Sequence, residues 1–462
     1  MLNIRKFFLL LLFCAFFFAV HAQQEPKVVS LDQLLNNVQL NAPSLLADSA
    51  AIRIKQAEVE ASRYNSLPSL KLNYQLDLGT NNNLPGGYFS YGIVPSNSRV
   101  REKGNASSIL TDMGIAAFDW EVYNFGAYAA RQHLALSDLT VEQLGFNQSK
   151  YKMKNITIAY YLQLIRLNDM RAIQAQNIMR NQEIKRTIHA LAVAGIKAGV
   201  DTSIAEAELS KARLIELELS NEVKKIQLQL SSISGLQAQA IVPDTLLEDR
   251  LINSYTAYWA VQPDTASHPL LQYYKALHQN SLDKEALLKK LYMPKVSLQA
   301  AIWGRGSSVS AYDEFRALYK GIGFERGNYL VGVGITYDVF DNKRKKLQLK
   351  TQQSGTAYAL QKLHEQETEI SISIQQAQVE LTTAYDRLQE IPRQLEAANA
   401  AYRQKLSLYR NGLTDIVELN AALNILYRAE TDYTNARYLF CKALFEKALV
   451  ENQLPVLLQT LN

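Results

Sequence analysis

The chain has 462 residues and a formal net charge of +5, from 49 Lys and Arg against 44 Asp and Glu. This length allows two or three ordinary domains, and so mild a charge gives no case for nucleic-acid binding. Residues 1–22 are typical of a secretory signal peptide, because Arg5 and Lys6 precede an apolar run that ends at a small-residue cleavage site. We therefore expect a mature chain that begins near Gln23 and keeps one cysteine, Cys441, which forms no internal disulfide.

After a helix predicted at 31–65, residues 68–78 show the clearest pattern of the chain. Apolar and polar side chains alternate there, and the apolar ones share one parity: Leu70, Leu72, Tyr74, Leu76 and Leu78. A β-strand sends successive side chains to opposite faces, so this segment has one apolar and one polar face. About 9–11 residues suffice for a tilted strand to cross a bilayer. A half-buried strand of a soluble sandwich has the same pattern, so both interpretations stay open here.

A second strand is predicted at 109–123, with a slip of phase near Ala116 that suggests a bulge. The residues that follow lack proline and favour a helix of roughly 100 Å, at 1.5 Å per residue. A cluster of helix breakers at Gly195–Asp201 then precedes a return helix. The segment 126–235 is therefore predicted to be a long helical hairpin.

The second half of the chain follows the same plan. A helix is predicted at 269–292, strands at 294–303 and 329–340, and a second long helical hairpin at 343–450. Within that hairpin, apolar residues recur every seven positions from Ile374 onward, which indicates coiled-coil packing.

The two halves also share landmarks. Pro43 and Pro68 are 25 residues apart, and Pro269 and Pro294 have the same separation. Equal spacing of matched landmarks indicates an internal repeat. This predicts two structural repeats, at 23–250 and 251–462.

Four strands cannot close a barrel, since the smallest has about eight. An open sheet edge cannot face lipid, because its unpaired backbone groups would cost several kcal/mol each. If these are membrane strands, several copies of the chain must combine them. Aromatic residues beside the strands suit the interface between membrane and water, although each also fits simple core packing: Trp120, Tyr123, Trp303, Tyr337 and Phe340.

Catalysis finds no support in the sequence. None of the six histidines lies in a His-x-x-x-His arrangement, and no nucleotide-binding loop is present. The scattered carboxylates of the long helices are typical of solvated faces. We therefore expect neither an enzyme nor a metal or cofactor site.

The whole mature chain resembles the TolC family of outer-membrane efflux and secretion ducts. The resemblance depends on the order of several short segments and on the prolines that open the second repeat. The segments are Asn41–Pro43, Ser66–Leu70, Trp120–Tyr123, Gly412–Glu418, Leu426–Ala429 and Asn435–Tyr438.

The resemblance implies a mixed α/β membrane protein of the outer membrane that extends into the periplasm. Three copies would share a twelve-stranded transmembrane barrel, which a coiled-coil helical tunnel continues. The implied function is export by efflux or type I secretion, with a periplasmic membrane-fusion adaptor and an inner-membrane transporter of RND or ABC type as partners. The alternative from a different class is a soluble periplasmic coiled-coil scaffold or adaptor.

Two helix turns are expected to form the periplasmic tips that meet the adaptor. They are Gly199, Val200 and Asp201 in the first repeat, and Gly412, Leu413 and Thr414 in the second. Both lie where a long helix reverses direction, at the end away from the strands, and glycine permits the positive φ that such turns need.

Glu418 is aligned by the resemblance with an acidic residue that rings the channel constriction in this family. Ala421 stands where the best-known members have a second acid, so a less acidic gate is expected. Thr414 replaces a basic residue that helps to lock some family tips. An acid favoured by the nearby helix N-terminus is the plainer interpretation of Glu418.

Overall fold

The computed structural model describes residues 28–80, 103–195, 198–258 and 264–459, so the predicted signal peptide lies outside the described residues. The chain divides into two compact units. The helical unit contains Met1–Arg53, Val141–Leu277 and Leu360–Asn462, and the strand unit contains Ile54–Thr140 and His278–Ala359. Each unit takes segments from both halves of the chain. These units therefore differ from the predicted repeats, which divide the chain by sequence.

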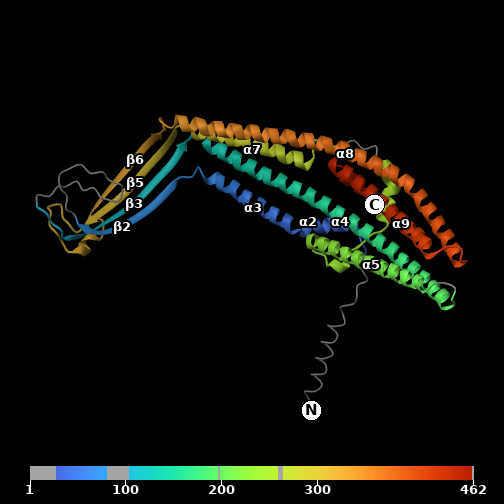
Figure 1. Ribbon diagram of the computed structural model, residues 1–462. Helices are drawn as coiled ribbons and strands as arrows, with labels where there is room; N and C mark the ends of the chain where they lie inside the picture. Colours follow the sequence, from blue (N-terminus) through green and yellow to red (C-terminus); the bar gives the residue numbers. More distant parts are fainter. Residues whose placement is uncertain (1–27, 81–102, 196–197, 259–263, 460–462) are drawn as a thin grey trace, which may run out of the picture. The chain divides into compact units, whose positions relative to one another are not determined.

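Four antiparallel strands form the sheet of the strand unit, in the order β2, β3, β5, β6 (Figure 1). Their bounds are β2 Ser69–Thr80, β3 Ser108–Tyr123, β5 Lys295–Ser307 and β6 Arg326–Thr336. Each half of the chain contributes one hairpin, and the hairpins join through β3 and β5. The first three strands match the predicted segments 68–78, 109–123 and 294–303 to within a few residues.

The predicted strand 329–340 is wrong at its carboxyl end, because β6 stops at Thr336. Thr336 pairs with Lys295, the first residue of β5, and the residue before Lys295 is Pro294. Proline has no backbone N–H to donate to a ladder. The pairing therefore ends at this point.

The bulge predicted near Ala116 lies elsewhere. The register of β3 is continuous through Ala116 and shifts only between Glu121 and Tyr123. The apolar alternation weakens earlier because Gly114 lies beneath the ring of Phe324, and a Cβ on Gly114 would collide with that ring. The pattern is irregular because the Phe324 ring leaves no room for a side chain at position 114, and the register of β3 does not change there.

Two pairs of long helices follow the strands. α4 (Ala127–Val193) precedes α5 (Gly199–Ser234), and α8 (Asn342–Arg410) precedes α9 (Ile416–Val450). The other elements are β1 Val28–Val29, α2 Leu31–Asn41, α3 Pro43–Tyr64, η1 Ala238–Ala240, β4 Val242–Pro243, α6 Leu247–Tyr258, α7 Pro269–Leu291, η2 Leu318–Gly321 and α10 Leu454–Gln459. In the described part of the chain, no helix has a stretch long and apolar enough to cross a bilayer.

The main core of the helical unit combines side chains from α2, α4, α5, α6 and α9. Tyr161 of α4 is fully buried there, and its hydroxyl donates to the carbonyl oxygen of Val29 at 2.8 Å. The same hydroxyl accepts from the backbone N–H of Asp244, also at 2.8 Å. Tyr161 thus joins the N-terminal strand β1 to the segment that follows β4.

Candidate channel wall, helix turns and constriction

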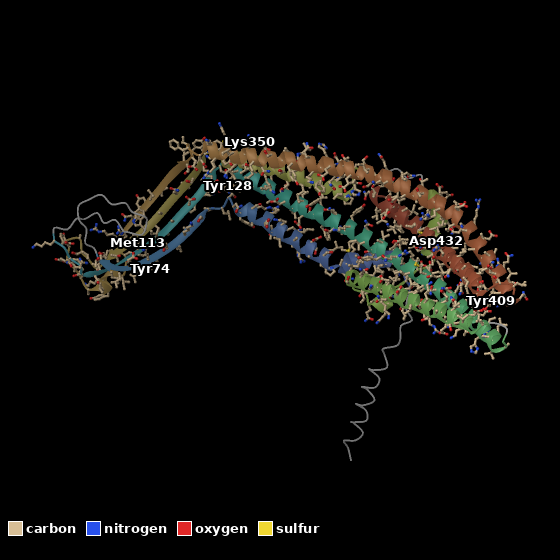
Figure 2. The ribbon with its side chains drawn as sticks, in the orientation of Figure 1. Tyr74, Met113, Tyr128, Lys350, Tyr409 and Asp432 are labelled. Carbon is tan, nitrogen blue, oxygen red and sulfur yellow. The ribbon has the colours of Figure 1, made fainter. Side chains whose placement is uncertain are left out.

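The sheet has one apolar and one polar face, as its register shows. Tyr74 pairs with Gly114, Gly114 with Gly304 and Gly304 with Gly327, so these four residues share a face. The same face carries apolar side chains on every strand, and many of the larger ones are exposed: Leu70, Leu72, Leu76, Leu78, Ile302, Tyr329, Val331, Val333 and Ile335. Figure 2 labels one residue from each face, Tyr74 and Met113. An exposed apolar surface of this extent is typical of an interaction or membrane-contact surface.

The connection between β5 and β6 folds back over one end of this apolar face. The ring of Phe324 lies against Gly304, where an added Cβ would come within 2.5 Å of it. Asp112, on the apolar face of β3, accepts from the N–H of Gly323 at 2.9 Å and from the hydroxyl of Tyr74 at 3.1 Å. The apolar band is thus bounded by polar loop structure at the end of the sheet away from the helices.

The opposite face is polar. Lys71, Asn73, Gln75 and Asp77 alternate with the leucines of β2, and Gln299 of β5 donates to Asp119 of β3 at 3.1 Å. All twelve residues of the edge strand β2 are exposed. Strand β6 forms the other edge, so among the described residues neither outer edge of the four-stranded sheet has a partner strand.

The aromatic residues predicted for the membrane interface do not form one group. Trp120 lies on the apolar face opposite Leu298, and its indole N–H donates to the carbonyl oxygen of Ser66 at 2.9 Å. Trp303 has the other parity and pairs with Asn328, which places it on the polar face. A residue that meets lipid must lie on the apolar face, so Trp303 does not fit the predicted girdle.

The other three aromatic residues lie near the helix-side end of the sheet. Tyr123, the last residue of β3, is exposed and makes an edge contact with Phe125, their ring centroids 4.8 Å apart. Tyr337 and Phe340 lie beyond the end of β6, where Lys345 places its ammonium 5.3 Å from the Tyr337 ring centroid. Phe340 is fully exposed. Their place at a membrane interface stays a prediction.

The turn between α8 and α9 ends the helix with two characteristic backbone hydrogen bonds. The N–H of Leu413 donates to the carbonyl oxygen of Leu408, and the N–H of Gly412 donates to that of Tyr409. Gly412 has a φ of +76°, which side chains with a Cβ rarely adopt. Figure 2 labels Tyr409, the second-last residue of α8. The geometry leaves Leu413 at the surface with 73% of its area exposed.

In the turn between α4 and α5, Gly195 takes the positive φ, at +72°. Residues Gly199, Val200 and Asp201 form the first turn of α5. The three residues predicted for this turn therefore all lie in α5, just after the turn, but Val200 is still 61% exposed. An acid in the first turn, here Asp201, interacts favourably with the helix dipole.

Glu418 is held by three contacts at the start of α9. Asp415 is the N-cap residue, and its carboxylate accepts from the N–H of Glu418 at 2.8 Å. The Glu418 carboxylate accepts from the ammonium of Lys405 at 2.5 Å and from the hydroxyl of Thr414 at 2.7 Å. The hydrogen bond from Lys405, followed by that from Thr414, lowers the pKa of Glu418. The carboxylate is therefore ionised at neutral pH and largely balanced by Lys405.

Sequence reasoning missed Lys405, although a signal was present. The turn centred between Asn411 and Gly412 is equally far from Lys405 and Glu418 along the chain. Residues equidistant from a tight helix reversal lie at the same height on the two helices. A basic and an acidic residue in that relation favour an ion pair.

Ion pairs also connect α4 to the second hairpin within the helical unit. Arg180 makes a bidentate contact with Glu430 of α9, at 2.8 and 2.6 Å. Near the turns, Arg410 of α8 donates to Glu183 at 2.5 Å. These pairs relate residues more than 220 positions apart, which periodicity alone does not connect.

A buried charge cluster joins α6 to α9. Arg437 donates to Glu248 at 3.1 Å and to Asp249 at 2.7 Å. Glu248 is fully buried, and burial raises its pKa to about 7, an effect that Arg437 opposes. Asp169 of α4 adds a further negative charge nearby, and burial raises its pKa as well. Nothing local in the sequence indicates this cluster, because its members come from three distant segments.

In the described residues, no group of three or more His, Cys, Asp or Glu side chains could hold a metal ion.

The sequence model for the family described as Outer membrane efflux protein matches residues 34–236 and 264–444. No curated protein matches the chain.

Solved structures of outer-membrane channels resemble this fold over most of its length. VceC from Vibrio cholerae is 14% identical, with a TM-score of 0.68 over 92% of this chain and 95% of its own. CmeC from Campylobacter jejuni is 12% identical, with a TM-score of 0.71 over 92% and 86%. MtrE from Neisseria gonorrhoeae, solved in an open state, is 15% identical, with a TM-score of 0.65 over 92% and 89%. At these identities the likeness concerns the fold.

Proposed function

Because this chain belongs to the outer membrane efflux protein family, we propose that three copies combine their sheets into one twelve-stranded barrel. The protein is an outer-membrane efflux channel with a periplasmic extension, and it is not an enzyme. Membership of this family leaves no place for the alternative of a soluble scaffold.

The observation that carries the proposal is the pair of open sheet edges, β2 and β6. In lipid, their unpaired backbone groups would cost several kcal/mol each, so each edge needs a partner strand. With an even number of antiparallel strands per copy, β6 of one copy can pair antiparallel with β2 of the next. Two copies would give eight strands, whose interior side chains fill the barrel, whereas three leave room for a lumen.

Native mass spectrometry of the full-length protein, purified in mild detergent, tests this assembly. We expect a trimer with a strong helical signal in circular dichroism. A monodisperse monomer or dimer with intact secondary structure would contradict the proposal.

The helical hairpins would continue the barrel as a tunnel, whose turns dock a periplasmic adaptor that connects to an inner-membrane transporter of RND or ABC type. Val200 and Leu413 are exposed apolar residues at the two helix reversals, with 61% and 73% of their areas exposed, which supports a docking role. Glutamate at either position would place a charge in this contact. We expect Val200→Glu and Leu413→Glu to abolish pump-dependent resistance in a susceptibility assay.

The matched controls are Val200→Ala and Leu413→Ala, which keep the contact apolar and should retain most of the resistance. Trimer formation is measured for all four variants, so that assembly defects are recognised. Full resistance in both glutamate variants would rule out docking at these turns.

Glu418 would lie at the narrow end of the tunnel, where three copies of its carboxylate attract cations. Since Lys405 balances each carboxylate, Lys405→Gln should raise the cation preference in single-channel recording, and Glu418→Gln should lower it. Glu390→Gln, which removes an exposed acid elsewhere on α8, is the control and should have no effect. Unchanged selectivity in both of the first two variants would exclude a constriction at Glu418.

A further inference from the structure

Arg305 and Arg326 lie directly opposite each other on neighbouring strands. They are the last pair in the ladder between β5 and β6, and both are exposed. Arg305 has the parity of Trp303, so both arginines lie on the polar face of the sheet. Like charges in directly opposed positions destabilise a sheet. Such a pair therefore calls for an explanation other than stability.

No acidic side chain balances this pair among the residues that the structure describes. The nearest acid in sequence, Glu325, directs its carboxylate to Arg316 at 3.3 Å, and only its backbone N–H reaches the carbonyl oxygen of Arg305. The strand neighbour of Arg305 on the other side is Met113, which pairs in turn with Gln75. The row across the polar face therefore reads glutamine, methionine, arginine, arginine.

The height of this row along the sheet is also informative. Arg305 lies about 33 Å from Lys295 along β5, at 3.3 Å per residue. A tilted strand needs about 9–11 residues to cross the hydrocarbon core of a bilayer, so the two residues are separated by about one such crossing. On the apolar face at this height, the loop that carries Phe324 and Gly323 covers Gly304 and Gly306. The arginine pair is thus at the end of the sheet that is farthest from the helices.

We propose that Arg305 and Arg326 form a basic collar inside the outer mouth of the barrel, which binds the phosphate or carboxylate groups of anionic solutes as they leave. The inference rests on the proposed trimeric barrel, in which the polar face lines the lumen. Each of three copies would then contribute two guanidinium groups to one ring. Guanidinium groups bind phosphate and carboxylate with paired hydrogen bonds, and the low-dielectric wall of a channel concentrates counter-charged solutes.

A cysteine placed beside the collar can report its local potential. Asn328 lies on the same face as Arg326, two residues along β6, and is exposed. Apart from Cys14 in the predicted signal peptide, the only native cysteine is Cys441, which is buried. Full-length Asn328→Cys protein in neutral phosphatidylcholine vesicles is treated with thiosulfonate reagents of similar size, one carrying a sulfonate and one a trimethylammonium group. Neutral vesicles leave no anionic lipid headgroup to occupy the collar.

We expect the sulfonate reagent to be favoured at low ionic strength. The ratio of the two modification rates should fall about tenfold when Arg305→Gln and Arg326→Gln are added to Asn328→Cys, because two nearby positive charges are lost from each copy. Pyrophosphate should slow the sulfonate reaction only when both arginines are present. The control Lys320→Gln removes one positive charge from the covering loop and should leave the ratio within about twofold.

A cysteine at Val331, on the apolar face, separates failure of the collar from failure of the barrel. In lipid it should react with neither charged reagent. If Val331→Cys reacts and Asn328→Cys does not, the assignment of the faces is wrong and the proposed barrel fails with it. If Asn328→Cys reacts but its rate ratio and its response to pyrophosphate are the same without the arginines, the barrel stands and the collar is excluded.

Discussion

Replacing Arg437 by methionine is expected to lower the free energy of unfolding of the helical unit by about 3 to 5 kcal/mol. Arg437 is the counter-charge of Glu248, whose side chain is only 1% exposed. Without it, the carboxylate of Glu248 stays in the interior near Asp249 and Asp169 with no cation to balance it. Guanidinium denaturation in mild detergent, followed by helical circular dichroism, measures the loss.

The stability lost in Arg437→Met should depend on pH, because protonation neutralises the Glu248 carboxylate and removes the unbalanced charge. In the native protein the pKa of Glu248 is raised to about 7, mainly by burial, so the folded state holds a proton that the unfolded chain releases near its ordinary pKa. Stability therefore falls as pH rises through this window. Removing Arg437 raises the pKa further, so the variant should lose less stability at about pH 5 than at about pH 9.

An exposed ion pair on α8 provides the control. Arg393 contacts Glu390 at 3.1 Å, with their side chains 80% and 72% exposed. Arg393→Met should change stability by no more than about 0.5 kcal/mol. Adding Glu248→Leu to Arg437→Met should restore most of the loss, since the unbalanced charge is then absent. Equal losses for Arg393→Met and Arg437→Met would contradict the role of burial.

Replacing Tyr161 by alanine should cost about 3 to 5 kcal/mol, as large aromatic truncations in a packed core do. The ring is fully buried among helices from both halves of the chain, and the hydroxyl holds Val29 and Asp244. Tyr161→Phe keeps the ring but leaves two backbone groups without their partner, so a loss of about 1 to 3 kcal/mol is expected. The same denaturation experiment applies, with exposed Leu217→Ala as a control of small effect.

The pH dependence of the Tyr161 variants distinguishes the hydroxyl from the ring. Burial raises the pKa of Tyr161 to about 12, so the folded protein keeps a proton that the unfolded chain loses near pH 10. Stability of the native protein should therefore decline from about pH 10 to about pH 12 more steeply than that of Tyr161→Phe. If stability changes with pH in the same way for the native protein and for Tyr161→Phe, the hydroxyl of Tyr161 does not make the buried hydrogen bonds with Val29 and Asp244.

Local patterns in the sequence were sufficient for most individual elements. The alternation of leucines in β2 and the proline-free run of α4 each depend on residues near one another in the chain, so the strand and the helix could be predicted directly. The glycine turn after α8 was also predictable, because only a positive φ at Gly412 closes that helix end. The end of β6 was not, since it depends on a proline that precedes another strand, Pro294 before β5.

The partners of charged side chains were decided by tertiary structure. Sequence placed Glu418 near the start of a helix, but its balance by Lys405 depends on two helices lying side by side across a turn. Arg437 and Glu248 are 189 positions apart, and their burial together depends on the packing of α6 against α9. These contacts join residues that are far apart in the sequence, and the periodicity of a sequence predicts nothing about contacts at such separations.

The sequence by itself determined that this protein has four amphipathic strands and two long helical hairpins in two similar halves, because side-chain parity and helix periodicity are local properties. Its resemblance to a family of export channels followed from segments that remain in order along the chain. Only the tertiary structure decided which faces the strands share. Register depends on pairing between β3 and β5, which come from different halves. The pairing of β3 with β5 places Trp303 on the polar face, and the pairing of β5 with β6 sets Arg305 opposite Arg326, since a strand's neighbours decide what each of its side chains meets.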